Sequence, residues 1–501
     1  MVLVAMALHH YLGLCLLLLL SGLSSASLVL TKRDKLTACL ADARVPFAVK
    51  NSSEWTQDVT PYNLRLPYTP AAVAIPTSVR HVQAAVKCGV KHNVRVSAKA
   101  GGHGYGSYAF GGEDGHLVIV LDRMDDVTLN EDGTTAKIQP GARLGHVAVE
   151  LYDQGRRAIP HGSCPGVGIT GHVLHGGYGF ASRTHGLTLD WLIGATVILA
   201  DGSKVRCSST KNKDLFWALR GAGSSFGIVA ELEFKTFEAP TEVTPFSIEL
   251  DWNEREAVAG IKALQELAAE APAELNMQIY MAPTGQTIQG VYYGDTNGLN
   301  AALEPLLDTI DTQVSSASTM GWIEGLEHFA DGTELDQTYP YDLHSTFYKS
   351  SLMTRALSQK QIESFVSALF TNANNPSARH SWFVLLDCHG GGHSAVSKVG
   401  KSSTAYVHRD KLLLFQFSDS GSNGNYPKEG FALLKGFRES VTKSMTGGEW
   451  GMYANYLDTQ LDSETAQKLY WGSNLERLQQ IKNRLDPEQV FWNPQGVSTT
   501  E

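Results

Sequence analysis

The chain has 501 residues, of which 43% are hydrophobic, 18% charged and 9% aromatic, with 48 glycines. This composition is typical of a globular protein and excludes collagen-like, coiled-coil and disordered chains. Acidic residues outnumber basic ones by 51 to 41 and no basic stripe is present, so we expect no nucleic-acid partner. At roughly 150 residues per domain, the length predicts two or three domains.

The N-terminal segment predicts export. The apolar run from Leu12 to Leu20 is shorter than the about 20 residues needed to span a bilayer. Ser24-Ser25-Ala26 follows it as a small-x-small cleavage pattern. We interpret residues 1–26 as a signal peptide and expect a secreted, extracellular protein that is not held in a membrane. A membrane anchor is the alternative that the length disfavours, and Lys32-Arg33 is a candidate processing site.

Export makes the cysteines candidates for disulfides. Five follow the signal peptide, so at least one is unpaired or has another use: Cys39, Cys88, Cys164, Cys207 and Cys388. None of their spacings forms C-x-x-C, and we expect no metal site. The only N-x-[ST] sequon predicts a glycan on Asn51.

Apolar periodicity predicts a βαβ unit near the start of the mature chain. Its parts are a strand at 73–76, a helix through Lys91 that Thr77 or Ser78 caps, and a strand at 94–97. Further strands are predicted at 117–121, 193–199 and 228–234, with turns at 130–133 and 201–202.

After Ala239-Pro240 the pattern changes to that of an α+β domain. Predicted helices at 254–271 and 358–370 alternate with strands at 278–282 and 412–417. One long final helix is predicted from Ser463 to Leu485.

Three glycine clusters lie in the first half, in residues 101–106, 162–179 and 221–227. Glycines let backbone N–H groups approach a phosphate, so three clusters suggest a ligand the size of a dinucleotide. Tight turns without a ligand are the alternative. Residues 166–171 match G-x-G-x-x-G, but no strand precedes them, so we reject a Rossmann site. Residues 223–227 match G-x-S-x-G, but they lead into a strand, so we reject a nucleophile elbow.

His103 lies in the first cluster and Cys164 in the second. Elsewhere such residues are usually structural, but here both are nucleophiles in loops predicted to surround one ligand, and a flavin ring could be attacked by both. Asp387 ends an apolar run, and Tyr456 lies in Tyr453-Ala-Asn-Tyr456. A tyrosine with a pKa near 10 serves as a base only where its phenolate is stabilised.

Together these motifs resemble the berberine-bridge-enzyme-like branch of the vanillyl-alcohol-oxidase flavoproteins, and especially the secreted fungal glucooligosaccharide and chitooligosaccharide oxidases. The resemblance spans residues 36–493 and is carried by five motifs: PYNLRL at 61–66, GGHGYGSY at 101–108, HGSCPG at 161–166, GLTLDW at 186–191 and DLFWALRG at 214–221.

The resemblance implies a PCMH-type FAD-binding domain formed by 36–240 and 451–501. Residues 241–450 would form an α+β substrate domain with an antiparallel sheet over the flavin. FAD would be bicovalent, attached to His103 and Cys164. The other implied FAD contacts are Gly101, Gly102, Gly104, Tyr105, Gly106, Ser107, Gly166, Gly168, Gly171, Gly176, Gly177, Gly179 and Ile228.

The resemblance also implies the catalytic pair and the sugar site. The family base maps onto Tyr456 and its supporting carboxylate onto Asp387. Tyr105, Ser163 and Gln416 fall at sugar-lining positions, where Ser163 replaces a common Thr, and Phe383 and Tyr280 could stack on sugar faces. A disulfide between Cys39 and Cys88 agrees with both the family arrangement and the position of Cys88 on the predicted helix.

Two departures bear on the substrate. Leu385 stands where the family often has a sugar-contacting Gln, and Tyr280 where a relative has Glu, so directional contacts to hydroxyls are lost. We expect a monomeric oxidase that converts the reducing-end C1 hydroxyl of an oligosaccharide to a lactone and reduces O₂ to H₂O₂. The alternatives are an enzyme of the same fold acting on another alcohol or a secondary metabolite, a dehydrogenase that excludes O₂, and a sugar-binding protein without redox activity.

Overall fold

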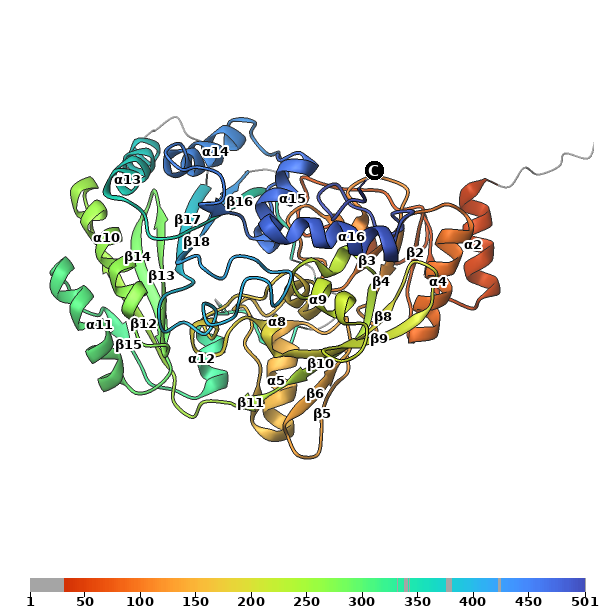
Figure 1. Cartoon of the computed structure of the whole chain (residues 1–501), viewed down its shortest axis with the longest axis horizontal. Coiled ribbons are helices and arrows are strands. Elements are labelled where there is room, and N and C mark those ends of the chain that lie inside the picture. The colour runs from red at the N-terminus through yellow and green to blue at the C-terminus, as the bar shows by residue number, and fades with distance from the viewer. Residues whose placement is uncertain are drawn as a thin grey trace, which may run out of the picture.

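The computed structural model describes residues 31–330, 332–337, 341, 343–374, 381–421 and 425–500. The predicted signal peptide lies outside these residues. Four sheets divide the described chain into two layered regions that meet along one side (Figure 1). No helix within the described residues is long and apolar enough to cross a membrane.

The N-terminal region contains the predicted βαβ unit. Its four-stranded sheet has the order β1 (Phe47–Ala48), β2 (Ala72–Ala74), β4 (Leu117–Val120) and β3 (Val96–Lys99). Strand β4 lies between β2 and β3 and is parallel to both. Helix α4 (Val79–Lys91) connects β2 to β3, and the side chain of Ser78 accepts the backbone N–H of His81 at its N-terminus. Its apolar face packs on this sheet.

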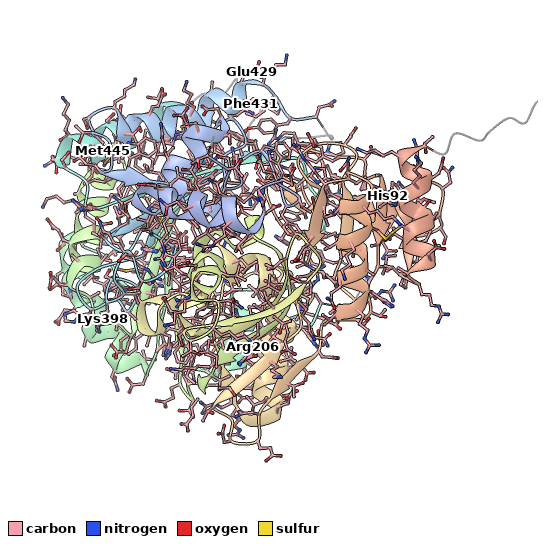
Figure 2. The ribbon with its side chains drawn as sticks, turned by 45° about the vertical axis from the view of Figure 1, so that its right-hand side comes forward. His92, Arg206, Lys398, Glu429, Phe431 and Met445 are labelled. Atoms are coloured by element: carbon pink, nitrogen blue, oxygen red, sulfur yellow. A yellow bond between two sulfur atoms is a disulfide. The ribbon has the colours of Figure 1, made fainter. Side chains whose placement is uncertain are left out.

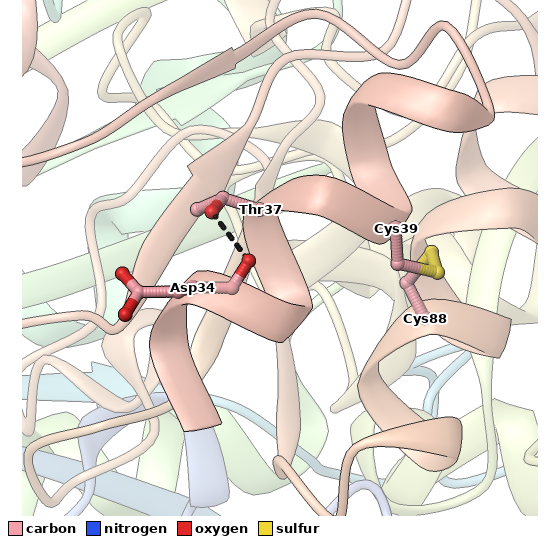
Figure 3. The surroundings of a disulfide bond; sticks show 4 residues. All are labelled: Asp34, Thr37, Cys39 and Cys88. Carbon is pink, nitrogen blue, oxygen red and sulfur yellow. Dashed lines mark hydrogen bonds between the residues drawn. A yellow bond between two sulfur atoms is a disulfide. The ribbon is translucent and has the colours of Figure 1, made fainter. Parts of the chain in front are cut away.

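Helix α2 (Lys32–Asp42) is joined to α4 by a disulfide between Cys39 and Cys88, as predicted (Figure 3). In Figure 2 the yellow sulfur atoms lie between these two helices at the N-terminal edge of the molecule. Cys207 and Cys388 are buried free thiols. The disulfide therefore links α2 to the helix that packs on the first sheet.

A second, five-stranded antiparallel sheet adjoins the first. Its order is β5 (Val127–Leu129), β6 (Thr135–Ile138), β10 (Ile228–Lys235), β8 (Leu192–Ile198) and β9 (Lys204–Ser208). A two-stranded sheet pairs β7 (Arg157–Ala158) with β11 (Phe237–Glu238). The helices of this region are α3 (Trp55–Val59), α5 (Leu144–Gly155), α6 (Ile169–Leu174), α7 (Ser182–His185), α8 (Thr188–Trp191) and α9 (Lys213–Ala222).

The C-terminal residues return to this region. Helix α16 (Leu475–Leu485) lies beside α9 (Figure 1), α15 (Ser463–Trp471) contacts α16, and both contribute to the same hydrophobic core as α9. The prediction of one continuous helix here is wrong, because Gly472 has φ of +45° and ends α15. Only glycine adopts such backbone angles at little cost.

The middle of the chain forms an eight-stranded antiparallel sheet. Its order is β15 (Ser316–Ala317), β12 (Thr244–Leu250), β14 (Gly285–Tyr292), β13 (Leu275–Ala282), β17 (Ser381–Cys388), β18 (Leu413–Ser420), β16 (Phe347–Thr354) and β19 (Trp450–Gly451). Helices α10 (Glu254–Glu270), α11 (Thr296–Ile310), α13 (Gln359–Ala373) and α14 (Glu429–Thr442) cover its outer face (Figure 1). Helix α12 (Trp322–His328) packs near β12.

Strand β17 shows how this sheet separates its two faces. Val384 and Leu386 are fully buried in the core that the sheet shares with its helices. Phe383, Leu385 and Asp387 alternate with them and line a cavity on the opposite face. The alternation of apolar and cavity-facing residues therefore turns one face of the sheet toward the N-terminal region.

Candidate active site

A cavity of about 500 Å³ separates the glycine-rich loops from the inner face of the large sheet. Residues from both ends and from the middle of the chain line it. Volumes of about 300 to 1,000 Å³ are usual for small-molecule and cofactor sites. The cavity therefore requires all three chain segments to be folded together.

The glycine loops form a backbone cradle on one side of this cavity. A Cβ on Gly101 would collide with the backbone of Gly168, so the first two glycine loops touch each other. At Gly104 and Gly171 a Cβ would meet nothing within 4 Å. Such exposed backbone can approach a phosphate or a ring without steric hindrance. The backbone N–H groups of these loops and the open space beside them fit a nucleotide cofactor.

The two predicted nucleophiles both line the cavity. His103 follows β3, and its ring stacks on Tyr62 at a centroid distance of 3.8 Å. Burial, with the positive charges of Arg143 and Lys349, lowers the pKa of His103 to about 3, so the ring is neutral. Cys164 lies in the loop between β7 and α6 and is exposed toward the cavity. Burial raises the pKa of the Cys164 thiol. The structure thus places two neutral nucleophiles in one site.

The predicted catalytic pair lies at the wall that joins the two regions. Tyr456 belongs to a short 3₁₀ helix, Ala454–Tyr456, and its ring stacks on Tyr105 at 5.8 Å. Burial raises the pKa of Tyr456 well above its ordinary value, and the nearby carboxylate of Asp387 acts in the same direction. Burial also raises the pKa of Asp387 to about 8. At neutral pH both groups therefore hold their protons before a substrate binds.

Strands β13, β17 and β18 form the side of the cavity that we call its roof. Cross-strand pairing aligns their side chains in rows. Tyr280 on β13 is opposite Leu385 on β17, which is opposite Gln416 on β18. The next row pairs Gln278 with Asp387. Residues directly opposite each other share one face of the sheet. The apolar Leu385 therefore lies between a tyrosine ring and an amide, one row from Asp387.

Of the predicted sugar contacts, all but Tyr280 line the cavity. Gln416 donates to the hydroxyl of Tyr105 at 2.6 Å, and both line the cavity, as do Ser163 and Phe383. Tyr280 is not among the lining residues; its ring stacks on Phe383 at 5.5 Å. Tyr280 thus lies beside Phe383 on the same face of the sheet.

The predicted cofactor contacts divide in the same way. Those that line the cavity are Gly101, Gly102, His103, Gly104, Tyr105, Cys164, Gly168, Gly171, Gly179 and Ile228. Gly106, Ser107, Gly166, Gly176 and Gly177 are not among the lining residues. A Cβ on Gly176 would meet the ring of Tyr453, and the N–H of Gly177 donates to the Tyr453 hydroxyl at 2.9 Å. These two glycines therefore accommodate a neighbouring tyrosine.

Several lining residues were missed by the sequence analysis. The ammonium of Lys349 lies 4.5 Å from the ring centre of Tyr105, and burial lowers the pKa of Lys349 to about 8, although Cys164 acts in the opposite direction. Gln278 and Asn455 also line the cavity. Asn455 belongs to the predicted Tyr453–Tyr456 motif, which was a usable signal. Lys349 and Gln278 lie in ordinary strand sequences that carry no such signal.

Comparison with known proteins identifies the ligand class and the family. The family described as "FAD binding domain" matches residues 70–208, and the family described as "Berberine and berberine like" matches residues 452–498. A chitooligosaccharide oxidase from Gibberella zeae is 51% identical over 94% of this chain and 96% of its own length. The FAD-linked oxidoreductase dpmaF from Metarhizium anisopliae is 50% identical over 93% of this chain and 91% of its own.

A solved structure agrees with both sequence comparisons. The glucooligosaccharide oxidase from Acremonium strictum, described with a 6-S-cysteinyl, 8α-N1-histidyl FAD, superposes with a TM-score of 0.90 at 46% identity. The match covers 93% of this chain and 99% of that one. The chain belongs to the berberine-bridge-enzyme-like family of FAD-dependent oxidoreductases, which includes the fungal oligosaccharide oxidases.

Proposed function

We propose that this protein is an FAD-dependent oxidase that converts the C1 hydroxyl of the reducing-end sugar of an oligosaccharide to a lactone. O₂ would be the electron acceptor and H₂O₂ the second product. The observation that carries this proposal is one cavity lined by both nucleophiles, by Tyr456 and by the carboxyl group of Asp387. The names of two relatives, a chitooligosaccharide oxidase and a glucooligosaccharide oxidase, support the same substrate class.

We further propose that the cofactor is attached through His103 and Cys164, as in the Acremonium strictum relative. The flavin of bound FAD supplies the hydride acceptor for the C1 hydrogen. Both proposed tether residues lie on the glycine-loop side of the cavity, whereas Tyr456 approaches from the C-terminal segment. A sugar bound in this cavity would have its C1 hydroxyl within reach of Tyr456 as the base.

In this scheme Tyr456 takes the proton of the C1 hydroxyl and passes its own proton to Asp387. The relay needs an ionised Asp387, and burial holds the pKa of that carboxyl at about 8. Turnover is therefore expected to rise as the pH increases toward 8. Gln416 and Tyr105 are hydrogen-bonded to each other, and both can form hydrogen bonds with sugar hydroxyls. Phe383 offers an apolar face to the sugar ring.

A substrate panel tests the proposal. Cellobiose, xylobiose, lactose and chitobiose are incubated with the yellow protein, and H₂O₂ and the corresponding aldonic acid are quantified. We expect equal amounts of both products with at least one sugar. Tyr456→Phe should lower turnover by about 10²-fold or more while the flavin absorbance is retained. A colourless protein, or near-normal turnover by Tyr456→Phe, contradicts the assignment.

A second candidate function is oxidation of a different alcohol, such as a secondary metabolite. Leu385 favours it, because an apolar side chain at the centre of the roof offers no hydrogen bond to a sugar hydroxyl. This candidate predicts that no sugar of the panel is oxidised while an apolar alcohol yields H₂O₂. A dehydrogenase would instead reduce a dye faster than O₂.

We also propose that the protein is secreted as a monomer with a glycan on Asn51. Asn51 is exposed and has φ of +86°, in the turn before α3. An exposed turn leaves the amide nitrogen accessible for glycosylation. Enzymatic deglycosylation should lower the mass of the secreted protein, and Asn51→Gln should remove that change. An unmodified peptide containing Asn51 in secreted material would contradict this proposal.

A further inference from the structure

Tyr341 belongs to the segment between α12 and β16, yet it contacts both loops that carry the proposed tether residues. Its hydroxyl oxygen lies 2.8 Å from Nε2 of His103. Its ring lies so close to Gly166, two residues after Cys164, that a Cβ at Gly166 would collide with it. One side chain from the middle of the chain therefore connects the two glycine-rich loops.

Arg143 holds this arrangement together. Its guanidinium lies 4.2 Å from the centre of the Tyr341 ring, a distance at which a cation and an aromatic face attract each other. The same Arg143 donates from Nη1 to the carbonyl oxygens of Gly101 and Gly166, one in each loop. The carbonyl bonds fix the spacing of the loops, and the cation–π contact fixes Tyr341 against both.

The chain on either side of Tyr341 is also attached to the N-terminal region. Asp336 bonds to Nδ1 of His146 at 3.1 Å. On the other side, Nδ1 of His344 lies 2.9 Å from the carbonyl oxygen of Pro61. These attachments are separate from the contacts of Tyr341 itself. Hydrogen bonds of Asp336, Tyr341 and His344 together thus set the position of the Tyr341 hydroxyl.

The bond to Tyr341 leaves only one nitrogen of His103 available to form another bond. The ring is neutral at physiological pH, because burial, Arg143 and Lys349 lower the pKa of His103 to about 3. A neutral imidazole has one N–H and one nitrogen with a lone pair. If Nε2–H donates to the Tyr341 oxygen, the lone pair is on Nδ1. Stacking on Tyr62 at 3.8 Å limits tilting of the ring.

We propose that Tyr341 is a positioning residue for covalent attachment of the flavin to His103, holding Nε2 so that Nδ1 faces the cavity with its lone pair free. The inference rests on the proposed FAD tether. Arg143 supports it by keeping Tyr341 and both loops in place. The Tyr341 hydroxyl bonds to His103, so we expect its loss to affect the bond of His103 to the flavin and not the bond of Cys164.

The attachment step balances with O₂ as the oxidant. Nδ1 of His103 forms a bond to the 8α methyl carbon of the flavin, from which one C–H bond is broken. The Nε2 proton then leaves, so that the alkylated ring is neutral. Two electrons and two protons pass to O₂ and give H₂O₂. Before the bond forms, the Tyr341 oxygen accepts from Nε2–H; afterwards its hydroxyl donates to Nε2, and a phenylalanine does neither.

The test compares Tyr341→Phe with Tyr426→Phe in the holoenzyme. The control removes a hydroxyl of similar burial that donates to Asp419 at 2.8 Å, away from both tether loops. After proteolysis, mass spectrometry measures the fraction of His103 peptides and of Cys164 peptides that carry flavin. We expect Tyr341→Phe to lower the His103 fraction at least about threefold, with the Cys164 fraction unchanged. Tyr426→Phe should change neither.

The outcomes separate this inference from the proposed function. Wild-type protein without flavin on its His103 peptide contradicts the proposed tether itself. A normal His103 fraction in Tyr341→Phe overturns the positioning role, as does an equal loss at both peptides, which would show a general distortion of the loops. Should the variant fail to fold, a crystal structure of the wild-type holoenzyme decides. Flavin bonded to Nδ1 with the Tyr341 oxygen near Nε2 supports the inference, and flavin bonded to Nε2 refutes it.

Discussion

Replacing Asp387 by asparagine should change how stability depends on pH. Only 5% of Asp387 is exposed, and burial raises the pKa of its carboxyl from 3.8 to about 8. One pKa unit corresponds to about 1.4 kcal/mol, so keeping this carboxylate ionised in the folded state costs about 6 kcal/mol. At pH 7, where the folded carboxyl is still mostly protonated, about 4 kcal/mol of that cost has accumulated. The amide that replaces the carboxyl in Asp387→Asn does not titrate.

The sign of this pH dependence follows from the number of protons that the folded and the unfolded protein bind. Between the unfolded pKa of 3.8 and the folded value of about 8, the folded protein binds the Asp387 proton and the unfolded chain does not. Stability therefore falls as the pH rises through this range, by about 1.4 kcal/mol per pH unit. Relative to Asp387→Asn, wild-type holoenzyme should lose about 4 kcal/mol of unfolding free energy between roughly pH 4.5 and 7.5.

Urea unfolding followed by circular dichroism measures this difference at several pH values. Asp410→Asn is the matched control. Although burial acts in the opposite direction, hydrogen bonds from Lys401 and Arg355 lower the pKa of Asp410 to about 2. Asp410 is thus ionised in both states over most of this range, and its variant should differ from wild type by a constant amount. Parallel pH profiles for wild type and Asp387→Asn would refute the burial argument.

Two further predictions concern the disulfide and the roof of the cavity. Replacing Cys39 and Cys88 together by serine should lower the unfolding free energy by about 4 kcal/mol, because the disulfide closes a loop with a sequence separation of 49. Thermal unfolding measures this loss, and an unchanged melting temperature would contradict the prediction. Leu385→Gln should change the ratio of kcat/KM for cellobiose to that for chitobiose about fivefold, since one hydrogen bond contributes about 1 kcal/mol. Steady-state kinetics with both sugars measures the ratio, and an unaltered ratio would mean that this position does not contact the sugar.

Features with local causes could be predicted from the sequence. The βαβ unit follows from apolar periodicity and from a capping serine at position 78, and the structure confirms it with boundaries shifted by one or two residues. The rejection of the Rossmann and elbow motifs agrees with their flanks, because residues 223–225 form a 3₁₀ turn before β10, and β7 ends eight residues before Gly166. Local pattern failed at Gly472, where one backbone angle divides the predicted helix.

The resemblance located the site, but the sequence did not reveal which residues share a wall. Lys349, Asp387 and Tyr341 are far from His103 in sequence and carry no motif in common with it. Lys349 and Asp387 line the same cavity as His103 because antiparallel pairing aligns β16, β17 and β18 and because the sheet rests on the glycine loops. Tyr341, which precedes β16, meets His103 through a hydrogen bond. Cross-strand pairing puts Tyr280 on the same face of the sheet as Leu385, with its ring against that of Phe383.

Some properties of this protein follow from its residue types alone. They are the side chains that can act as nucleophiles or acids, the positions of the glycines, and the strands in which apolar and polar residues alternate. Those properties depend on residue type and on neighbours within a few positions. The pKa of Asp387, the hydrogen bond between His103 and Tyr341, and the division of glycines between cavity and packing depend on the tertiary structure. Burial and hydrogen bonding to distant partners set these properties, and both arise only when the two ends and the middle of the chain pack together.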